Sequence, residues 1–127
     1  MIFGVGTDVV EIGRIEKALE RFGERFARRV LCAPELKRFV SHRQPAAYLA
    51  KRFAAKEAFA KALGTGIKAP ANWHGVWVTN LSSGKPELQF SDELKILLSG
   101  RGITRTHLSL ADERGVAVAT VILECEK

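Results

Sequence analysis

Residues 46–63, AAYLAKRFAAKEAFAKAL, form the strongest helix signal in the chain. The segment is rich in alanine, contains neither glycine nor proline, follows a polar stretch that ends in Pro45, and precedes Gly64. Alanine has the highest helix propensity, and glycine commonly follows the last helical residue. The sequence therefore predicts one long central helix against which the shorter elements pack.

Charged residues interrupt the apolar side of this predicted helix. At about 100° per residue, Lys56 falls within the arc that Phe53 and Leu63 define, and Glu57 lies at the edge of that arc. One interpretation is structural: Glu57 pairs with Lys61 at i,i+4 spacing, and Lys56 extends its charge to solvent. The other interpretation is functional, because charged residues interrupt an apolar pattern most often at functional sites.

The segment before the long helix predicts a strand followed by a broken helical region. Residues 2–10 are rich in Val and Ile and suit a buried strand. Between residues 13 and 22, apolar side chains recur at three- and four-residue spacing until Gly23 interrupts them. Further short helices are expected beyond Gly23, the last of them with Pro34 at its first position.

The segment after the long helix changes to β character. Residues 75–81 and 87–90 flank the turn-rich sequence SSGKP and predict a hairpin, after which Ser91 predicts the cap of a short helix. Residues 106–111 and 116–124 flank the turn DERG and predict a second hairpin. The expected fold is α+β: a small antiparallel sheet packed with a long central helix and shorter helices, in one domain over residues 1–127.

Composition indicates an ordinary globular chain. Of 127 residues, 46% are hydrophobic and 27% are charged, which excludes a disordered or fibrous protein. No apolar run approaches the roughly 18 residues of a membrane span, and the N-terminus lacks the basic start of a secretory signal, so a cytoplasmic location is expected. Cys32 and Cys125 show neither CxxC spacing nor a nearby histidine cluster, and are expected to be buried thiols.

Positive charge favours a polyanionic partner. The formal net charge is +6, and six basic residues lie between positions 14 and 29. Arg14, Lys17 and Arg21 lie opposite the apolar face of the predicted first helix, where they form either a solvated surface or a docking surface for an acidic partner. An enzyme, a small nucleic-acid-binding module and a noncatalytic adaptor for an acidic protein all remain compatible with this charge.

Asp8 lies within the apolar N-terminal strand, where a carboxylate needs a partner unless it occupies an edge or caps a neighbouring group. If Asp8 and Glu57 converge, their oxygens suit Mg²⁺, which takes one or two protein carboxylates together with phosphate oxygens and water. Lys61, one turn beyond Glu57, would add the positive charge that a phosphate requires. A nucleic-acid-binding module explains neither carboxylate.

The glycine-rich stretches at 4–6 and 64–66 match neither a Rossmann fingerprint nor a P-loop. From the residues alone, Gly64 is a helix C-cap and His107 is a structural hydrogen-bonding residue in a strand.

Three stretches taken together carry a family resemblance: GVGTDVVEI at 4–12, RFAAKEA at 52–58 and KALGTGI at 61–67. They resemble the bacterial holo-(acyl carrier protein) synthases of the 4′-phosphopantetheinyl transferase superfamily. The likeness continues through GKP at 84–86 and HLSLAD at 107–112, so it covers essentially the whole chain in the family's order.

The resemblance implies an enzyme that transfers the 4′-phosphopantetheine arm of coenzyme A to a serine of apo-acyl carrier protein, releases adenosine 3′,5′-bisphosphate and supports fatty acid biosynthesis. It implies Mg²⁺ as the cofactor, with Asp8 and Glu57 as its ligands. Lys61 matches a catalytic lysine near the pyrophosphate, and Glu57, directly or through water, is the preferred acceptor of the serine proton.

The resemblance also implies substrate contacts, a docking surface and an assembly. Arg14 and Arg21 match residues that dock the acidic carrier protein. The resemblance further implies assembly as a homotrimer, with active sites between protomers. No nucleic-acid or membrane partner is expected. The implied contacts with coenzyme A are Arg52, Lys61, Gly64, Gly66, Pro86 and His107.

Overall fold

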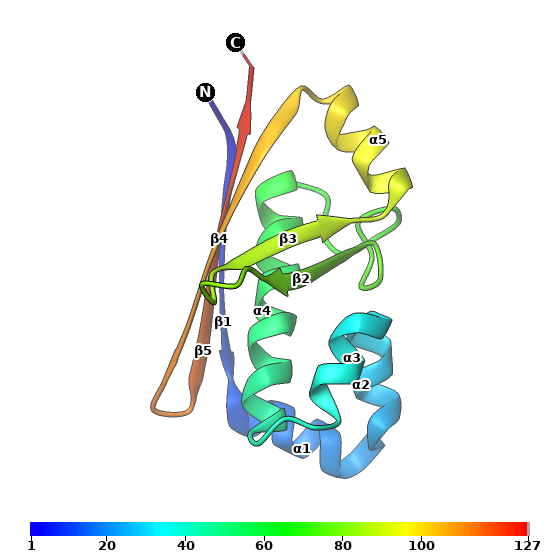
Figure 1. Ribbon diagram of the computed structural model, residues 1–127, viewed down its shortest axis with the longest axis vertical. Helices are drawn as coiled ribbons and strands as arrows, with labels where there is room; N and C mark the ends of the chain where they lie inside the picture. Colours follow the sequence, from blue (N-terminus) through cyan, green and yellow to red (C-terminus); the bar gives the residue numbers. More distant parts are fainter. Residues whose placement is uncertain (127) are drawn as a thin grey trace.

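The long helix α4 (Pro45–Leu63) packs across one face of a three-stranded antiparallel sheet (Figure 1). The strands are ordered β1 (Ile2–Glu11), β5 (Val116–Cys125) and β4 (Ile103–Glu113), so the two ends of the chain lie on neighbouring strands. This computed structural model describes residues 1–126. It confirms the predicted α+β fold with a long central helix.

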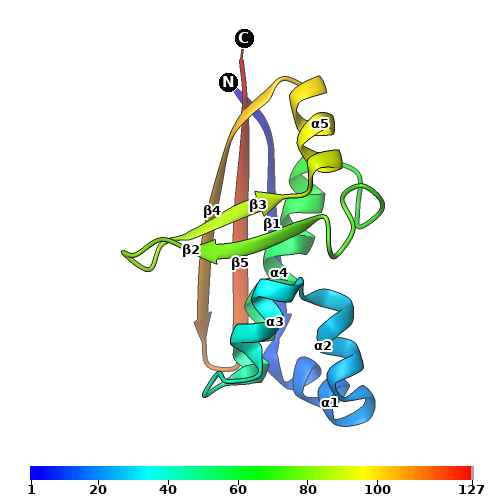
Figure 2. The same ribbon diagram turned by 45° about the vertical axis from the view of Figure 1, so that its right-hand side comes forward.

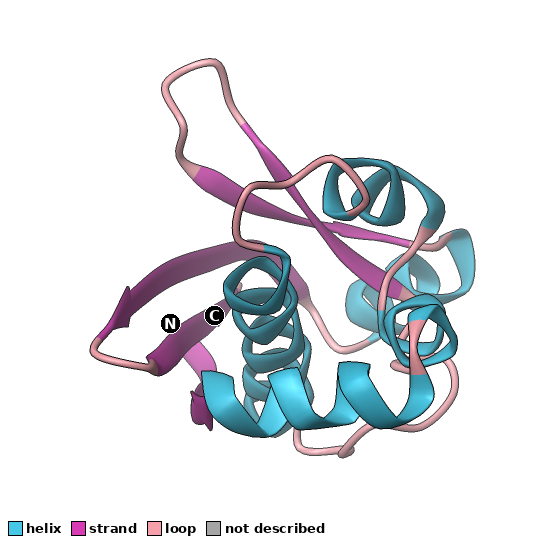
Figure 3. Cartoon of the chain, turned by 90° about the horizontal axis from the view of Figure 1, so that it is seen from below, coloured by secondary structure: helices cyan, strands magenta, loops and turns pink. Residues whose placement is uncertain are grey.

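The other elements lie on the opposite side of α4, as a view along that helix shows (Figure 3). Three short helices gather at one end of α4, a second hairpin crosses its middle, and a last helix lies near its other end (Figure 2). The strands thus divide between two sheets, a division that the strand patterns do not predict. These elements are α1 (Ile12–Phe22), α2 (Glu24–Val30), α3 (Ala33–Phe39), β2 (Val76–Asn80), β3 (Pro86–Phe90) and α5 (Asp92–Gly100).

Two glycines in β1 allow α4 to lie directly on the strand. A Cβ at Gly4 would lie 2.0 Å from the carbonyl oxygen of Ala62, and a Cβ at Gly6 would lie 1.9 Å from that of Ala58. Any side chain at either glycine would therefore overlap the helix backbone. Alternate residues of a strand share a face, so this contact also turns Asp8 toward α4.

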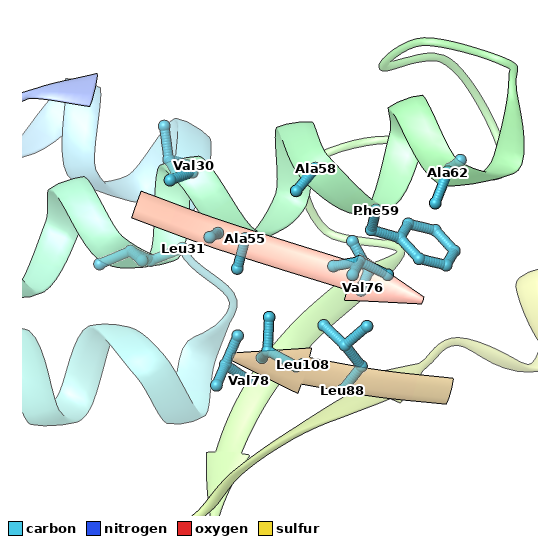
Figure 4. Close-up of a cluster of buried hydrophobic side chains, with 14 of the residues drawn as sticks. Val30, Leu31, Ala55, Ala58, Phe59, Ala62, Val76, Val78, Leu88 and Leu108 are labelled. Atoms are coloured by element: carbon cyan, nitrogen blue, oxygen red, sulfur yellow. The ribbon is translucent and has the colours of Figure 1, made fainter. Parts of the chain in front are cut away.

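The core lies between α4 and both hairpins (Figure 4). Alanines and Phe59 on α4 face apolar side chains from β2, β3 and β4. Within residues 1–126, no helix has both the length and the apolar character needed to cross a membrane. The labelled side chains in Figure 4 are Val30, Leu31, Ala55, Ala58, Phe59, Ala62, Val76, Val78, Leu88 and Leu108.

Several predicted boundaries are confirmed. Ser91 caps α5 by accepting a hydrogen bond from the N–H of Leu94 at 3.2 Å, and Gly64 ends α4 in the left-handed region with φ = 88°. Pro34 is the second rather than the first residue of α3, because the helix already begins at Ala33.

The predicted four-residue turn between the last two strands is shorter than expected. The strands extend to Glu113 and from Val116, and the turn consists of Arg114 and Gly115, with φ values of 51° and 80°. Two successive residues with positive φ match the twist of the flanking strands, which allows pairing to continue up to the turn.

Lys56 does not extend to solvent, so this part of the structural interpretation is wrong. The residue is 0% exposed, and its Nζ donates to Glu35 Oε1 at 2.7 Å, to Val30 O at 2.6 Å and to Trp73 O at 2.8 Å. The ammonium group thus has three acceptors from three other segments. Burial is tolerated because the charge is both paired and hydrogen-bonded.

Glu35 completes this buried ion pair from α3. Its carboxylate also accepts the backbone N–H groups of Cys32 and Val78, each at 2.9 Å. The pair therefore joins α3 and α4 to the end of α2, the loop after α4 and β2. Cys32, beside the pair, and Cys125 are half-buried rather than buried as expected.

We expect Gly6→Ala to destabilise the protein by about 3 kcal/mol or more, because an added Cβ collides with the backbone of α4 rather than with a movable side chain. Gly13→Ala is the matched control: no atom lies within 4 Å of its added Cβ, so its stability should be unchanged or slightly higher. Urea denaturation measures both, and equal stability of the two variants would contradict the packing argument.

We expect Lys56→Met to lower the free energy of unfolding by about 3 to 5 kcal/mol, since it leaves the Glu35 carboxylate buried without its cation. Adding Glu35→Gln should restore part of the loss, because an amide oxygen still accepts the two backbone N–H groups. Lys51 lies on the same helix as Lys56 and forms a more exposed ion pair with Asp112 of β4. Lys51→Met should therefore lower the free energy of unfolding by less than about 1 kcal/mol. Similar losses for the two lysine variants would refute this assignment.

Candidate active site

Asp8, Glu57 and Lys61 meet where β1 packs against α4. Lys61 Nζ lies 3.1 Å from Asp8 Oδ1 and 3.0 Å from the carbonyl oxygen of Thr7. Lys61 thus pairs with Asp8 across the helix–strand contact, and not with Glu57 along the helix as the structural interpretation held. The Asp8 side chain is 16% exposed, so its carboxylate is largely removed from solvent yet accessible from one side.

The two carboxylates interact electrostatically. Burial raises the pKa of Glu57, and the negative charge of Asp8 raises it further, while Lys61 opposes both effects. A cation between the carboxylates would remove this repulsion. Within residues 1–126, no group of three or more His, Cys, Asp or Glu side chains is placed to hold a metal. The available donor set is therefore two hard oxygen ligands, which suits an ion that keeps water or substrate oxygens.

A groove of about 480 Å³ opens beside the carboxylates, at the junction of β1, α1 and α4. Asp8, Glu57 and Arg14 contribute its charged groups. Phe26 and Phe53 line it with aromatic rings, whose centroids lie 6.5 Å apart. One wall can thus bind a cation or a polar ligand, while the other can contact an apolar group.

Pro86 and His107 lie together, but in a different pocket. This pocket has a volume of about 160 Å³ and lies between β3 and β4. It shares no lining residue with the groove beside Asp8 and Glu57. Two of the predicted substrate contacts are therefore adjacent to each other and separate from the carboxylates within one chain.

Arg52 lies in a third pocket, of about 450 Å³, which Arg38 and Lys51 also line. The residue is 5% exposed; its guanidinium lies 4.2 Å from the ring centroid of Tyr48 and donates to Asn80 Oδ1 at 2.9 Å. Burial lowers the pKa of Arg52. Its Nε has no hydrogen-bond partner within residues 1–126. The pocket gathers positive charge suited to an anionic group.

Gly64 and Gly66 lie just after α4. The N–H groups of Gly64, Thr65 and Gly66 all donate toward the carbonyl oxygen of Ala60, at N···O distances of 2.9, 3.2 and 3.4 Å. These donors close the end of the helix, as expected for a C-cap. In this conformation they are not available to bind a phosphate.

Arg14 and Arg21 are exposed on α1, seven residues apart and so on nearly the same face. Arg14 lines the groove beside the carboxylates, whereas the guanidinium of Arg21 lies 5.2 Å from the ring centroid of Phe22. A smaller pocket nearby is lined by Phe22, Arg25, Phe26 and Arg29. Positive charge and exposed aromatic surface thus occur together along α1 and α2.

The sequence did not indicate two features of these pockets. Phe26 and Phe53 pattern as core residues, and only the packing of α1 and α2 against α4 turns them toward the groove. Glu124, which forms a hydrogen bond with His107, lies in a strand whose pattern signals burial alone. Helical or strand periodicity carries no information about either contact.

Comparison with known proteins identifies the family. Residues 4–120 match the 4′-phosphopantetheinyl transferase superfamily. The holo-[acyl-carrier-protein] synthase of Nitrosospira multiformis is 53% identical over 124 residues, which cover 98% of this chain and 99% of that protein. The protein of the same name from Vibrio parahaemolyticus is 52% identical, covering 97% and 98% of the two chains.

Solved structures agree with the sequence comparison. A crystal structure of holo-[acyl-carrier-protein] synthase from Neisseria meningitidis superposes with a TM-score of 0.95 at 44% identity, covering 98% of this chain and 99% of the other. A holo-(acyl-carrier-protein) synthase from Bacillus anthracis, in complex with CoA (3′,5′-ADP), superposes with a TM-score of 0.84 at 35% identity, covering 99% of each chain. The chain therefore belongs to the holo-[acyl-carrier-protein] synthases of the 4′-phosphopantetheinyl transferase superfamily.

Proposed function

We propose that this protein transfers the 4′-phosphopantetheine group of coenzyme A to a serine of apo-acyl carrier protein in the cytoplasm, in support of fatty acid biosynthesis. The products are holo-acyl carrier protein and adenosine 3′,5′-bisphosphate. The observation that carries the proposal is that Asp8 and Glu57 line one groove and Lys61 binds Asp8, in a chain related to these synthases over nearly its whole length.

We assign a Mg²⁺ site to Asp8 and Glu57. The fit rests on two hard oxygen ligands and on the repulsion from Asp8 that raises the pKa of Glu57. When bound, Mg²⁺ would neutralise negative charge on the pyrophosphate of coenzyme A. Lys61 holds Asp8 through Oδ1 and adds a second positive charge at the same place.

The transfer requires positioning and charge neutralisation more than a nucleophile on the enzyme. The serine hydroxyl of the carrier attacks the phosphorus nearest the pantetheine arm, and the bond to the bridging oxygen breaks, so adenosine 3′,5′-bisphosphate leaves. We assign Glu57, directly or through water, as the acceptor of the serine proton, because its carboxylate lines the groove beside Arg14, where the carrier would present its serine. Lys61 stabilises the charge that develops on the leaving phosphate.

Coenzyme A, in this proposal, spans surfaces from two protomers of a homotrimer. Two pockets are separate from the carboxylate groove: the one with Pro86 and His107, and the basic one around Arg52. The proposed contacts with coenzyme A therefore lie in separate places on one chain. Assembly through the outer face of the three-stranded sheet would bring pieces of neighbouring chains together. Gly64 and Gly66 would shape the chain after Lys61 rather than donate to phosphate.

The outer sheet face supports such an assembly because exposed apolar side chains gather on its β1–β5 part. Val5 pairs with Ile122, and Val9 pairs with Val118, so these four side chains share that face. Val5 is 55% exposed and Val9 is 61% exposed. Apolar surface gathered on a sheet face favours contact with another protein surface.

Arg14 and Arg21 form the proposed docking surface for the acidic carrier protein. Arg14 lies at the groove that holds the carboxylates, so a carrier bound along α1 would present its serine near Glu57. Charge complementarity of this kind mainly raises the rate of association and fixes orientation.

We expect Asp8→Ala and Glu57→Gln each to reduce transfer at least about 100-fold, because each removes one of the two metal ligands. Mass spectrometry of apo-carrier after incubation with coenzyme A and Mg²⁺ measures the loss. Excess chelator should stop the wild-type reaction. Full modification by either variant, or by the chelated wild type, would refute the metal assignment.

The metal-free Glu57→Gln variant should unfold at a higher temperature than metal-free wild type at neutral pH. The pKa of Glu57 is raised on folding, so its ionised form costs stability above that pKa, and the cost disappears when acid protonates the group. The difference in Tm should therefore shrink as the pH falls below the range where Glu57 titrates. This measurement also separates lost activity from lost folding.

Reversing both Arg14 and Arg21 to Glu should raise the apparent KM for carrier protein about tenfold at low salt and leave the affinity for coenzyme A near wild type. The salt dependence of the carrier KM should also fall, since exposed charges are screened over about 10 Å at 0.1 M salt. Lys95→Glu on α5 is the control and should leave the carrier KM unchanged. A wild-type KM for carrier protein in the double variant would show that Arg14 and Arg21 form an ordinary solvated surface.

Sedimentation equilibrium should give a trimer for wild type and a monomer for Val5→Glu, because the substitution buries a charge in the proposed interface. Ile96→Glu is the control, since Ile96 is 74% exposed on α5, away from the sheet. It should leave both mass and activity unchanged. If the Val5→Glu variant is monomeric and fully active, the proposal that protomers share the active site is wrong.

A further inference from the structure

His107 is held by a carboxylate from the neighbouring strand. Its Nε2 lies 2.5 Å from Glu124 Oε1. His107 pairs with Ile122 and Arg105 pairs with Glu124, so Glu124 lies diagonally across β5 on the same outer face as the imidazole. Within residues 1–126, Nε2 is the ring nitrogen with a hydrogen-bond partner, and Nδ1 has none.

Positive and hydrogen-bonding groups surround the Glu124 carboxylate. The hydrogen bond from His107 lowers the pKa of Glu124. Burial opposes this effect, and Arg105 and the N-terminal amine add smaller lowering effects. Arg105 Nε lies 3.9 Å from the same oxygen. From β3 and the turn before it, Glu87 and Lys85 line the pocket that His107 also lines. The carboxylate therefore lies among positive groups on its own sheet, and the His107 side chain that it binds lines a pocket of mixed charge.

We infer that Glu124 is a positioning residue for coenzyme A: it fixes the His107 imidazole through Nε2 and so presents Nδ1–H to a phosphate group bound between β3 and β4. This inference rests on the proposed function. In the bound arrangement Nε2 donates to the Glu124 carboxylate and Nδ1 donates to the phosphate oxygen, since both partners are acceptors. A partner that fixes one ring nitrogen thereby fixes the direction of the other.

Orientation matters here because the His107 side chain is 43% exposed. An exposed imidazole can rotate and would lose that freedom on binding its ligand. Glu124 restricts the ring before coenzyme A arrives, so less ordering remains for the binding step. The positive charges of Arg105 and the N-terminal amine offset the repulsion between the Glu124 carboxylate and an incoming phosphate.

The test is a double-mutant cycle on coenzyme A affinity, measured by calorimetry on the full-length protein with Mg²⁺. Glu124→Ala should weaken binding about threefold to tenfold, and His107→Ala should weaken it at least as much. The double variant should bind no more weakly than His107→Ala, because Glu124 acts only through the imidazole. Glu124→Gln should recover much of the loss, since its amide oxygen still accepts the Nε2 proton.

The kinetic signature separates positioning from a general structural role. In the transfer assay, Glu124→Ala should raise the KM for coenzyme A while leaving kcat near wild type. Glu126→Ala removes the same charge two residues further along the chain, where the residue is exposed, and should behave as wild type. Thermal unfolding of each variant confirms that the comparison is made between folded proteins.

Additive losses in the double variant, or wild-type affinity of Glu124→Ala, would overturn this inference alone. Failure of the wild type itself to bind coenzyme A would overturn the proposed function and this inference together. The two failures are therefore distinguished by the wild-type titration.

Discussion

The close contact between β1 and α4 places the proposed site. Gly4 and Gly6 offer no side chain to the helix, and Ala58 and Ala62 present their carbonyl oxygens at the same positions. The strand and the helix therefore approach more closely than ordinary side chains allow. Because Asp8 continues the same strand face, this approach brings its carboxylate to the helix residues that carry the proposed chemistry.

Neighbouring residues of α4 serve different purposes because each step along a helix turns the side chain by about 100°. Lys56 points into the interior and is held by Glu35 and two backbone carbonyls. Glu57 points toward the groove, where it shares space with Asp8 and its pKa is raised. One turn of helix thus contributes a buried structural ion pair and an ionisable group available to a ligand.

Function in this protein conflicts locally with stability. The Asp8 and Glu57 carboxylates repel each other in the free chain, and the outer face of the sheet leaves Val5 and Val9 exposed. Each feature is unfavourable for an isolated monomer, and each is relieved by a proposed partner, a cation for the carboxylates and other protomers for the sheet. Lys61 offsets part of the repulsion in the free chain.

The long helix, both hairpins, the cap at Ser91 and the helix end at Gly64 could be predicted from the sequence, since each depends on local propensity, periodicity or turn chemistry. The sequence also indicated the family, because the stretches at 4–12, 52–58 and 61–67 resemble those of the family and occur in the same order. Asp8 and Glu57 were recognisable as charges out of place in apolar patterns.

Which groups meet depends on how the elements pack in three dimensions. Lys61 binds Asp8 across 53 positions of sequence, and Lys56 binds Glu35 across 21. The structural interpretation of the sequence instead paired Glu57 with Lys61 and placed the charge of Lys56 in solvent. Likewise, His107 meets Glu124 only because β4 and β5 pair in one register. Periodicity shows that a side chain is buried or exposed on its own element, but the distance between two elements depends on how their surfaces pack together.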